Sequence, residues 1–337
     1  MFLRYLSSAI VLTCLSAMAV AQSEPCNSIE VPVGIINGSG ESFHGLSAAD
    51  FSVHAGKTPV ELKNMTFDSG PRRIVLVVDT SKRLSSETLK AERLLVETLV
   101  NGARPEDSLA MVTARGPQHV VKFGEEKSAF QAALPADGES RHGKEQGVLD
   151  AVMQTLPLFG DPKPGDSIVV IAADLGGNRG TNAKEVASAL EQHHIRMFGL
   201  ALGLVSTKNV ALSGQTTTAW GLAQVQNAMG DYSYNTGDSN FYPLTRDSGG
   251  LVLSVMNYSS RMTFSVKNPK FVARLKQQSM AVYNVIAGYY RVELATTHTG
   301  EWSFEPQPDV RKVAPNMFLL YPRQLTGCKA DAHVAAR

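Results

Sequence analysis

Two aspartates follow apolar runs that predict buried strands. Residues 74–78 (IVLVV) run without interruption to Asp79, and residues 167–173 (SIVVIAA) run to Asp174. Continuous runs of this kind are typical of strands that are buried on both faces of a parallel sheet. Open α/β sheets bind ligands outside the carboxyl ends of their strands. Both carboxylates therefore mark one edge of the predicted sheet as a candidate binding surface.

The segments around these two runs alternate between strand and helix patterns, which predicts a mostly parallel, doubly wound sheet. Helices are expected over residues 84–102, 148–156, 182–191 and 270–285. Further strands are expected over residues 109–113, 119–123, 196–202, 251–255, 289–294 and 316–321, the first two of them forming a hairpin at the sheet edge. Asn182 and Glu185 have the spacing of a capping box. Pro157 is expected to end the second helix.

After residue 21, the sequence predicts three parts. Residues 22–70 contain short strand-like stretches separated by turn sequences and predict a small β module. Residues 71–260 form the α/β unit, and residues 261–337 form a helix and strand extension. Within the α/β unit, a helix over residues 219–228 is expected inside a long polar loop. The nearby aromatic residues Tyr232, Tyr234, Phe241 and Tyr242 either take part in recognition or pack on the sheet edge.

The first 21 residues have the pattern of a secretory signal peptide. Arg4 precedes an apolar run over residues 9–20, and Ala19-Val20-Ala21 is a cleavage signal. Cys14 gives a weak lipobox as the alternative. No later stretch is apolar over the length that a bilayer requires, so no transmembrane segment is expected. The sequence thus predicts export, to the periplasm or outside the cell.

Two cysteines remain once the signal peptide is removed. Cys26 and Cys328 lie near opposite ends of the chain. An even number of cysteines in an oxidising compartment favours a disulfide, which would close a very long loop. The alternative is two unpaired, buried thiols.

Composition and motifs exclude several classes of function. The 32 basic and 31 acidic residues leave no basic stripe of the kind that nucleic-acid binding requires. No G-x-S-x-G nucleophile motif is present, and the glycines of residues 176–180 lack the spacing of a phosphate-binding loop. His193 and His194 are adjacent on a predicted helix end, where their side chains point in different directions. No catalytic residue is identified, so the chain is not expected to be an enzyme.

A strand followed by Asp79-Thr80-Ser81 and a helix, with a later strand ending at Asp174, resembles the von Willebrand factor A-type (VWA) domain. The phrases Asp50-Phe51 and Tyr289-Tyr290-Arg291-Val292 resemble the flanks of the exported VWFA-related family of acidobacteria. The resemblance covers residues 30–321. It implies a bacterial protein with an α/β fold, a three-layer α/β/α (Rossmann-like) VWA sandwich. The β module and the C-terminal extension would flank this sandwich.

The family carries a metal-ion-dependent adhesion site (MIDAS) with the pattern D-x-S-x-S, a threonine and a later aspartate. Such a set of oxygen ligands suits Mg²⁺. Asp79, Ser81 and Asp174 match this pattern. Arg83 replaces the second serine, and Gln146 lies near the position of the threonine. The resemblance therefore implies a degenerate MIDAS.

Arg83 suggests how two close carboxylates are tolerated without a metal. A guanidinium carries a permanent charge and five hydrogen-bond donors but no acceptor, so it cannot be a metal ligand. Placed between Asp79 and Asp174, it would offset the repulsion between them. The hypothesis is a metal-free site, and the alternative is weak Mg²⁺ binding with Arg83 turned away.

The resemblance implies an exported, non-catalytic protein that binds a protein or other macromolecule. Its binding surface would be formed by Asp79, Ser81, Arg83, Gln146 and Asp174, on loops at the carboxyl edge of the sheet. The alternative is a structural subunit of a cell-envelope or extracellular assembly, in which the site is vestigial and metal-free. Neither reading identifies the partner.

Overall fold

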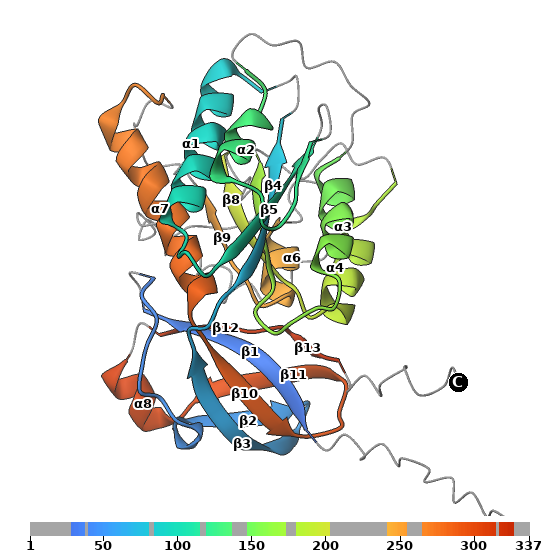
Figure 1. Ribbon diagram of the computed structural model, residues 1–337. Coiled ribbons are helices and arrows are strands. Elements are labelled where there is room, and N and C mark those ends of the chain that lie inside the picture. The colour runs from blue at the N-terminus through green and yellow to red at the C-terminus, as the bar shows by residue number, and fades with distance from the viewer. Residues whose placement is uncertain are drawn as a thin grey trace, which may run out of the picture.

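A computed structural model describes residues 28–37, 40–80, 84–114, 119–136, 147–172, 180–202, 241–254, 265–314 and 317–326. These residues form two sheets joined end to end (Figure 1). One sheet has six strands in the order β6-β5-β4-β7-β8-β9. The other has seven strands in the order β12-β1-β10-β3-β2-β11-β13.

The six-stranded sheet contains the two predicted buried strands, β4 and β7. Its strands are β4 (Arg73–Asp79), β5 (Ser108–Ala114), β6 (Val120–Val121), β7 (Ser167–Ala172), β8 (Arg196–Ala201) and β9 (Val252–Ser254). All neighbours are parallel except β6, which pairs antiparallel with β5 and confirms the predicted edge hairpin. β4 lies between β5 and β7, at the centre of the sheet.

Helices cover both faces of this sheet (Figure 1). α1 (Ser86–Gly102), α2 (Lys127–Ala132) and α7 (Pro269–Ala287) contribute to the core on one face. α3 (Val148–Phe159), α4 (Ala183–Gln192) and α6 (Phe241–Asp247) contribute to the core on the other face. Alternate residues of β4 enter the two cores: Ile74, Leu76 and Val78 enter the first, and Val75 and Val77 the second. This burial on both faces explains the unbroken apolar run.

α3 differs from the prediction because it continues past Pro157. The helix ends at Phe159, whose side chain is buried in the core. A proline in the last turn removes only one amide from the helix, so the final residues can remain helical when one of them is anchored. The guanidinium of Arg73 also lies over the Phe159 ring, 5.5 Å from its centroid.

The seven-stranded sheet is built from both ends of the chain. The N-terminal strands are β1 (Ile29–Ile36), β2 (Phe51–Ala55) and β3 (Thr58–Asp68). The C-terminal strands are β10 (Tyr289–Ala295), β11 (Gly300–Pro306), β12 (Phe318–Leu320) and β13 (Gln324–Leu325). The short helices η1 (Ala48–Asp50) and α8 (Pro308–Val313) accompany them. β10 pairs antiparallel with β1 on one side and with β3 on the other.

The predicted β module and C-terminal extension therefore form one sheet. β1 and β3 do not pair with each other, so the N-terminal strands require β10 between them. α7, which was predicted within the extension, packs instead beside α1 against the six-stranded sheet. Local hydrophobic periodicity identifies each element but does not specify which distant strands pair. The single sheet was therefore not predicted from the sequence.

A buried network of charged and polar groups holds the joint between the two sheets. The Asp107 carboxylate accepts hydrogen bonds from the Arg72 amide (2.8 Å), the Arg104 guanidinium (2.8 and 3.1 Å) and the Tyr283 hydroxyl (2.5 Å). Arg104 also donates to the carbonyl oxygens of Ser69 and Gly70, in the segment that links β3 to β4. Asp107 thus joins that link, the turn before β5 and helix α7.

A second contact across the joint is made by the turn before β9. The Ser248 hydroxyl accepts a hydrogen bond from the Met197 amide of β8 (2.9 Å), and Ser248 forms a β-bridge with Pro322. Gly250 lies so close to β8 that a Cβ atom there would be 1.9 Å from the carbonyl oxygen of Met197. Only glycine can occupy this position without displacing the backbone of a buried strand.

No helix in the described part of the chain is long and apolar enough to span a membrane.

Candidate functional site

Asp79 is the last residue of β4 and is fully buried at the carboxyl end of the six-stranded sheet. The next residue fixes the start of the following loop: both the amide and the hydroxyl of Thr80 donate to the carbonyl oxygen of Ala114, at 2.8 and 3.0 Å. Ala114 is the last residue of the neighbouring strand β5. The sheet therefore holds Asp79 rigidly at this edge, which we call the rim. In Figure 1 the β4 arrow points to the rim and away from the seven-stranded sheet.

The strands that carry the two predicted aspartates lie side by side and run in the same direction. Val78 of β4 is in register with Ile171 of β7, and β7 ends one residue later, at Ala172. This confirms the predicted arrangement of the two strands. Ser81, Arg83, Gln146 and Asp174 lie outside the described residues, as do Cys26 and Cys328, so the meeting of the side chains and the disulfide stay predictions.

The predicted loop helix and part of the predicted aromatic cluster also lie outside the described residues. Residues 219–228, Tyr232 and Tyr234 lie outside the described residues. Phe241 and Tyr242 open α6, which packs on one face of the six-stranded sheet. A role of the cluster in recognition stays a prediction.

Asp150 links the start of α3 to the residues just before α4. It lies in the first turn of α3, where its Oδ2 accepts a hydrogen bond from the Gly147 amide (2.9 Å). Its Oδ1 accepts another from the Thr181 amide (3.1 Å), just before α4. Gly147 directly follows residues 137–146, and Gly180 directly follows residues 173–179. One carboxylate therefore links the described residues that follow both segments.

The Asn182 and Glu185 capping box is confirmed beside this junction. The Asn182 side chain accepts a hydrogen bond from the Glu185 amide, and the Glu185 carboxylate accepts one from the Asn182 amide, both at 3.0 Å. These bonds satisfy two backbone amides at the start of α4 that would otherwise have no partner within the helix.

Glu87 anchors the opposite side of the rim. Its Oε2 accepts hydrogen bonds from the Ser265 hydroxyl (3.0 Å) and the Val266 amide (3.1 Å), which precede α7. The hydrogen bonds from Ser265 and Val266, together with the nearby Lys90 ammonium, hold the pKa of Glu87 below its ordinary value. The first turn of α1 and the segment before α7 are thereby tied together. Asp150 and Glu87 thus each tie together two described segments near the rim.

Sequence reasoning did not assign these anchoring roles to Asp150 and Glu87. Asp150 lies in the third position of a helix that follows Gly147, which is a recognisable capping signal. Its second bond, to Thr181, is a long-range contact with no local sequence signal. The same is true of the bonds between Glu87 and the segment before α7.

The set of side chains at the rim does not match a complete MIDAS. Of the residues expected to form the MIDAS, Asp79 is the one within the described part of the chain, and no group of three or more His, Cys, Asp or Glu residues there could hold a metal ion. In the sequence, arginine and glutamine replace two of the oxygen ligands that the family pattern requires. These departures reduce the fit to Mg²⁺, which demands near-octahedral oxygen coordination.

The strand order decides the fold type. Numbered along the chain, β4 to β9 have the order 3-2-1-4-5-6, which is a doubly wound order. The third strand is an antiparallel edge, and the first ends in an aspartate at the carboxyl edge. The six-stranded unit therefore has an open, doubly wound α/β fold with helices on both faces of the sheet. The α/β class predicted from the resemblance is therefore correct, although the seven-stranded antiparallel sheet makes up a larger share of the chain than expected.

Comparisons with known proteins give distant matches only. No family model and no curated protein matches the chain. Solved structures that match include an aerotolerance-related membrane protein from Bacteroides fragilis (15% identity, 64% of this chain and 98% of that chain, TM-score 0.41). BatB from Bacteroides thetaiotaomicron also matches (16% identity, 63% of this chain and 98% of that chain, TM-score 0.39). A von Willebrand factor type A protein from Catenulispora acidiphila matches as well (10% identity, 77% of this chain and 51% of that chain, TM-score 0.40). Likenesses this remote carry no inference about activity or partners.

Proposed function

We propose that this chain is an exported, non-catalytic VWA-type protein that binds another protein or macromolecule through the loops of the rim. The observation that supports the proposal best is the placement of Asp79 at the end of a central strand, beside loops whose ends are tied by Asp150 and Glu87. A rigid sheet with variable loops at one edge is a common arrangement for recognition. The partner surface would be formed by Ser81, Arg83, Gln146 and Asp174, with the fully buried Asp79 supporting it from the end of β4.

The function is tested by partner capture with rim variants. The full chain and its Arg83→Ala and Asp174→Ala variants are immobilised, and proteins retained from a cell-envelope extract are quantified by mass spectrometry. We expect a retained partner to fall at least about tenfold for both variants, because each removes a charge from the binding surface. Arg311→Ala is the control and should retain the partner, because Arg311 is an exposed residue of α8, the helix that follows β11 of the seven-stranded sheet.

The reverse pattern would support the structural-subunit alternative. Retention by both rim variants, together with loss in Arg311→Ala, would place the contact on the seven-stranded sheet. Thermal unfolding of each variant separates loss of binding from loss of folding.

We further propose that the rim site is metal-free, with Arg83 pairing with Asp79 and Asp174 in place of a cation. Arg83→Ser restores the D-x-S-x-S pattern and removes the competing charge. We expect this variant to gain Mg²⁺ binding that isothermal titration calorimetry detects and that the natural chain lacks, since an oxygen ligand replaces a cation. Adding Asp79→Asn to Arg83→Ser should abolish the gain. Tight one-to-one Mg²⁺ binding by the natural chain would reject the proposal.

Export and a Cys26–Cys328 disulfide complete the proposal. Ile29 and Thr326 line the same cavity, so described residues close in sequence to the two cysteines lie in one region of the molecule. Cys26 is three residues from Ile29 and Cys328 is two residues from Thr326. Three extended residues span about 10 Å, which makes pairing sterically accessible. Mass analysis of non-reduced peptides checks the pairing, and recovery of both cysteines as free thiols from protein exported by its native host would refute it.

A further inference from the structure

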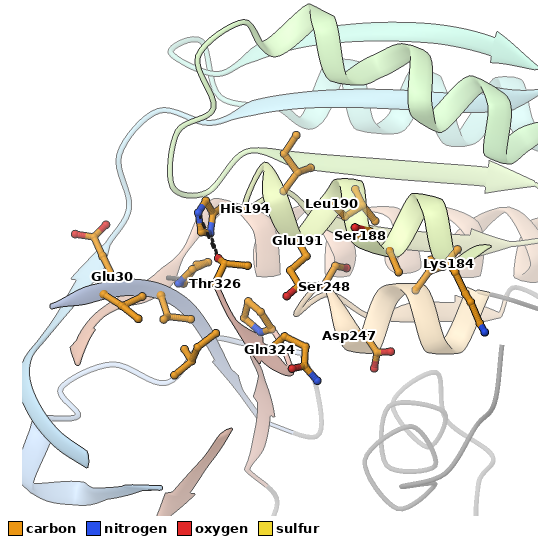
Figure 2. A pocket seen from close by; sticks show the side chains of 18 residues that line it. Glu30, Lys184, Ser188, Leu190, Glu191, His194, Asp247, Ser248, Gln324 and Thr326 are labelled. Carbon is orange, nitrogen blue, oxygen red and sulfur yellow. Dashed lines mark hydrogen bonds between the residues drawn. The ribbon is translucent and has the colours of Figure 1, made fainter. Parts of the chain in front are cut away.

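A cavity of about 320 Å³ lies between the two sheets, at the end of the six-stranded sheet opposite the rim (Figure 2). α4 and α6 form one wall, and β1 and β13 form the other. Its apolar lining comes from both walls: Ile29, Val31, Leu190, Ile195, Leu244 and Leu325. The His194 ring and the Thr326 hydroxyl, 3.2 Å apart, lie at one end. The cavity plays no part in the function proposed for the rim.

The strand edges that border this cavity are open. β1 pairs with β10 over Ile29–Val33, but it pairs with β12 only over Gly34–Ile36. Within the described part of the chain, no strand covers the other edge of residues 29–32, which line the cavity. Among the described strands, β13 is the last of the sheet and pairs only with β11. Pro32 lacks an amide, as is usual for an edge position. Such an edge can accept an extended peptide as an added strand.

The cavity also carries uncompensated negative charge. Glu191 and Asp247 both line it, from α4 and α6. Asp247 is paired with Arg246 (2.6 Å), whereas the Glu191 carboxylate has no ion pair or hydrogen bond with another side chain in the described part of the chain. Lys184, the lysine of the lining, is seven residues earlier on α4, about 10 Å along the helix axis. Glu30 is neutralised by two hydrogen bonds from Arg291.

Partial burial, and then the charge of Asp247, raise the pKa of Glu191. Both causes act on a carboxylate that lacks a cation beside it. A positive group brought into the cavity would reverse this effect and favour the ionised carboxylate.

We propose that the cavity docks an extended segment of a partner protein, which adds a strand along β1 and places a lysine or arginine against Glu191 and Asp247. The open backbone edge supplies main-chain hydrogen bonds, and the apolar lining receives the side chains on either side of the basic residue. The two carboxylates select for the positive charge. The combination of a strand edge, an apolar lining and the unpaired carboxylate of Glu191 favours a peptide over a compact small molecule.

The test uses a defined probe peptide, acetyl-Val-Thr-Val-Lys-Val-Thr-amide, labelled with fluorescein and measured by fluorescence anisotropy against the full chain. We expect saturable binding that weakens about tenfold for Glu191→Gln, because a charge-assisted hydrogen bond is lost. Glu97→Gln removes an exposed carboxylate on α1 and is the matched control, with no expected change. A peptide with norleucine in place of lysine should lose affinity for the natural chain but not for Glu191→Gln.

Strand addition has a separate readout. Two further peptides carry N-methyl groups on alternate residues, one for each edge, and keep every side chain. At least one should bind at least about tenfold more weakly, because methylation removes main-chain donors. Equal binding by all peptides, or binding that ignores Glu191, would overturn the proposal. Lys329 and Arg337 are basic residues of the chain's own segment after Thr326. If the peptide binds only when both are replaced by alanine, that segment is the occupant, and the proposal is overturned.

Discussion

Gly250→Ala is expected to prevent stable folding of this chain. A methyl group at residue 250 would lie 1.9 Å from the carbonyl oxygen of Met197 and 2.7 Å from its carbonyl carbon, far inside van der Waals contact. Both atoms belong to the backbone of β8, a fully buried strand that cannot move without disturbing β7 and β9. We expect the free energy of unfolding to fall by more than about 4 kcal/mol, which places the change among the most severe single substitutions.

Soluble yield, gel filtration and urea unfolding followed by circular dichroism measure this effect. Gly180→Ala is the matched control, because the nearest atom to a Cβ there is a side-chain oxygen at 4.0 Å. Its free energy of unfolding should stay within about 1 kcal/mol of the natural value. A Gly250→Ala protein with natural stability would show that the close approach to β8 is wrong.

Replacing Asp107 by asparagine is expected to lower the free energy of unfolding by about 3 kcal/mol at neutral pH. The change leaves the partly buried Arg104 guanidinium without its carboxylate and places an amide group among donors from Arg72, Arg104 and Tyr283. Glu106→Gln is the control, since Glu106 is half exposed and its carboxylate lies 3.5 Å from the same guanidinium, farther than the carboxylate of Asp107. It should change the free energy by less than about 1 kcal/mol.

The effect of Asp107 depends on pH in a defined direction. Burial works to raise the pKa of Asp107, but hydrogen bonds from Arg104, Tyr283 and the Arg72 amide outweigh it and hold the pKa below the ordinary value. A lowered carboxyl pKa stabilises the fold above the pKa of the unfolded state, about 4. This contribution is lost as the pH falls through the folded value. The difference between the natural chain and Asp107→Asn should therefore shrink below pH 4 in urea unfolding; a constant difference would contradict the assignment.

The doubly wound α/β unit was predictable because its signals are local. The runs that end at Asp79 and Asp174 owe their composition to burial on both faces, and this composition is visible without a structure. Parallel neighbours in such a sheet end at one edge, so the position of Asp79 followed from its place after the first run. The antiparallel β6 and the capping box at Asn182 were equally readable from turn and capping patterns.

The features that the sequence did not reveal depend on contacts between distant residues. The pairing of β10 with both β1 and β3 joins residues more than 200 positions apart, and no local pattern encodes it. The same holds for the bond between Asp150 and Thr181 and for the cavity near Glu191, whose walls come from four separate segments. Each of these residues looks like an ordinary helix or strand position when it is considered alone.

The placement of β10 between β1 and β3 has a consequence for biosynthesis. The α/β unit, from β4 to α7, is contiguous in sequence, so a nascent chain can assemble it once residue 287 has left the ribosome. β1 must wait for a partner that is synthesised about 260 residues later, which takes roughly 10–50 s at ordinary elongation rates. During that interval the apolar face of β1 has no strand to cover it. We therefore expect the early N-terminal strands to be the part of the newborn polypeptide that most needs a chaperone.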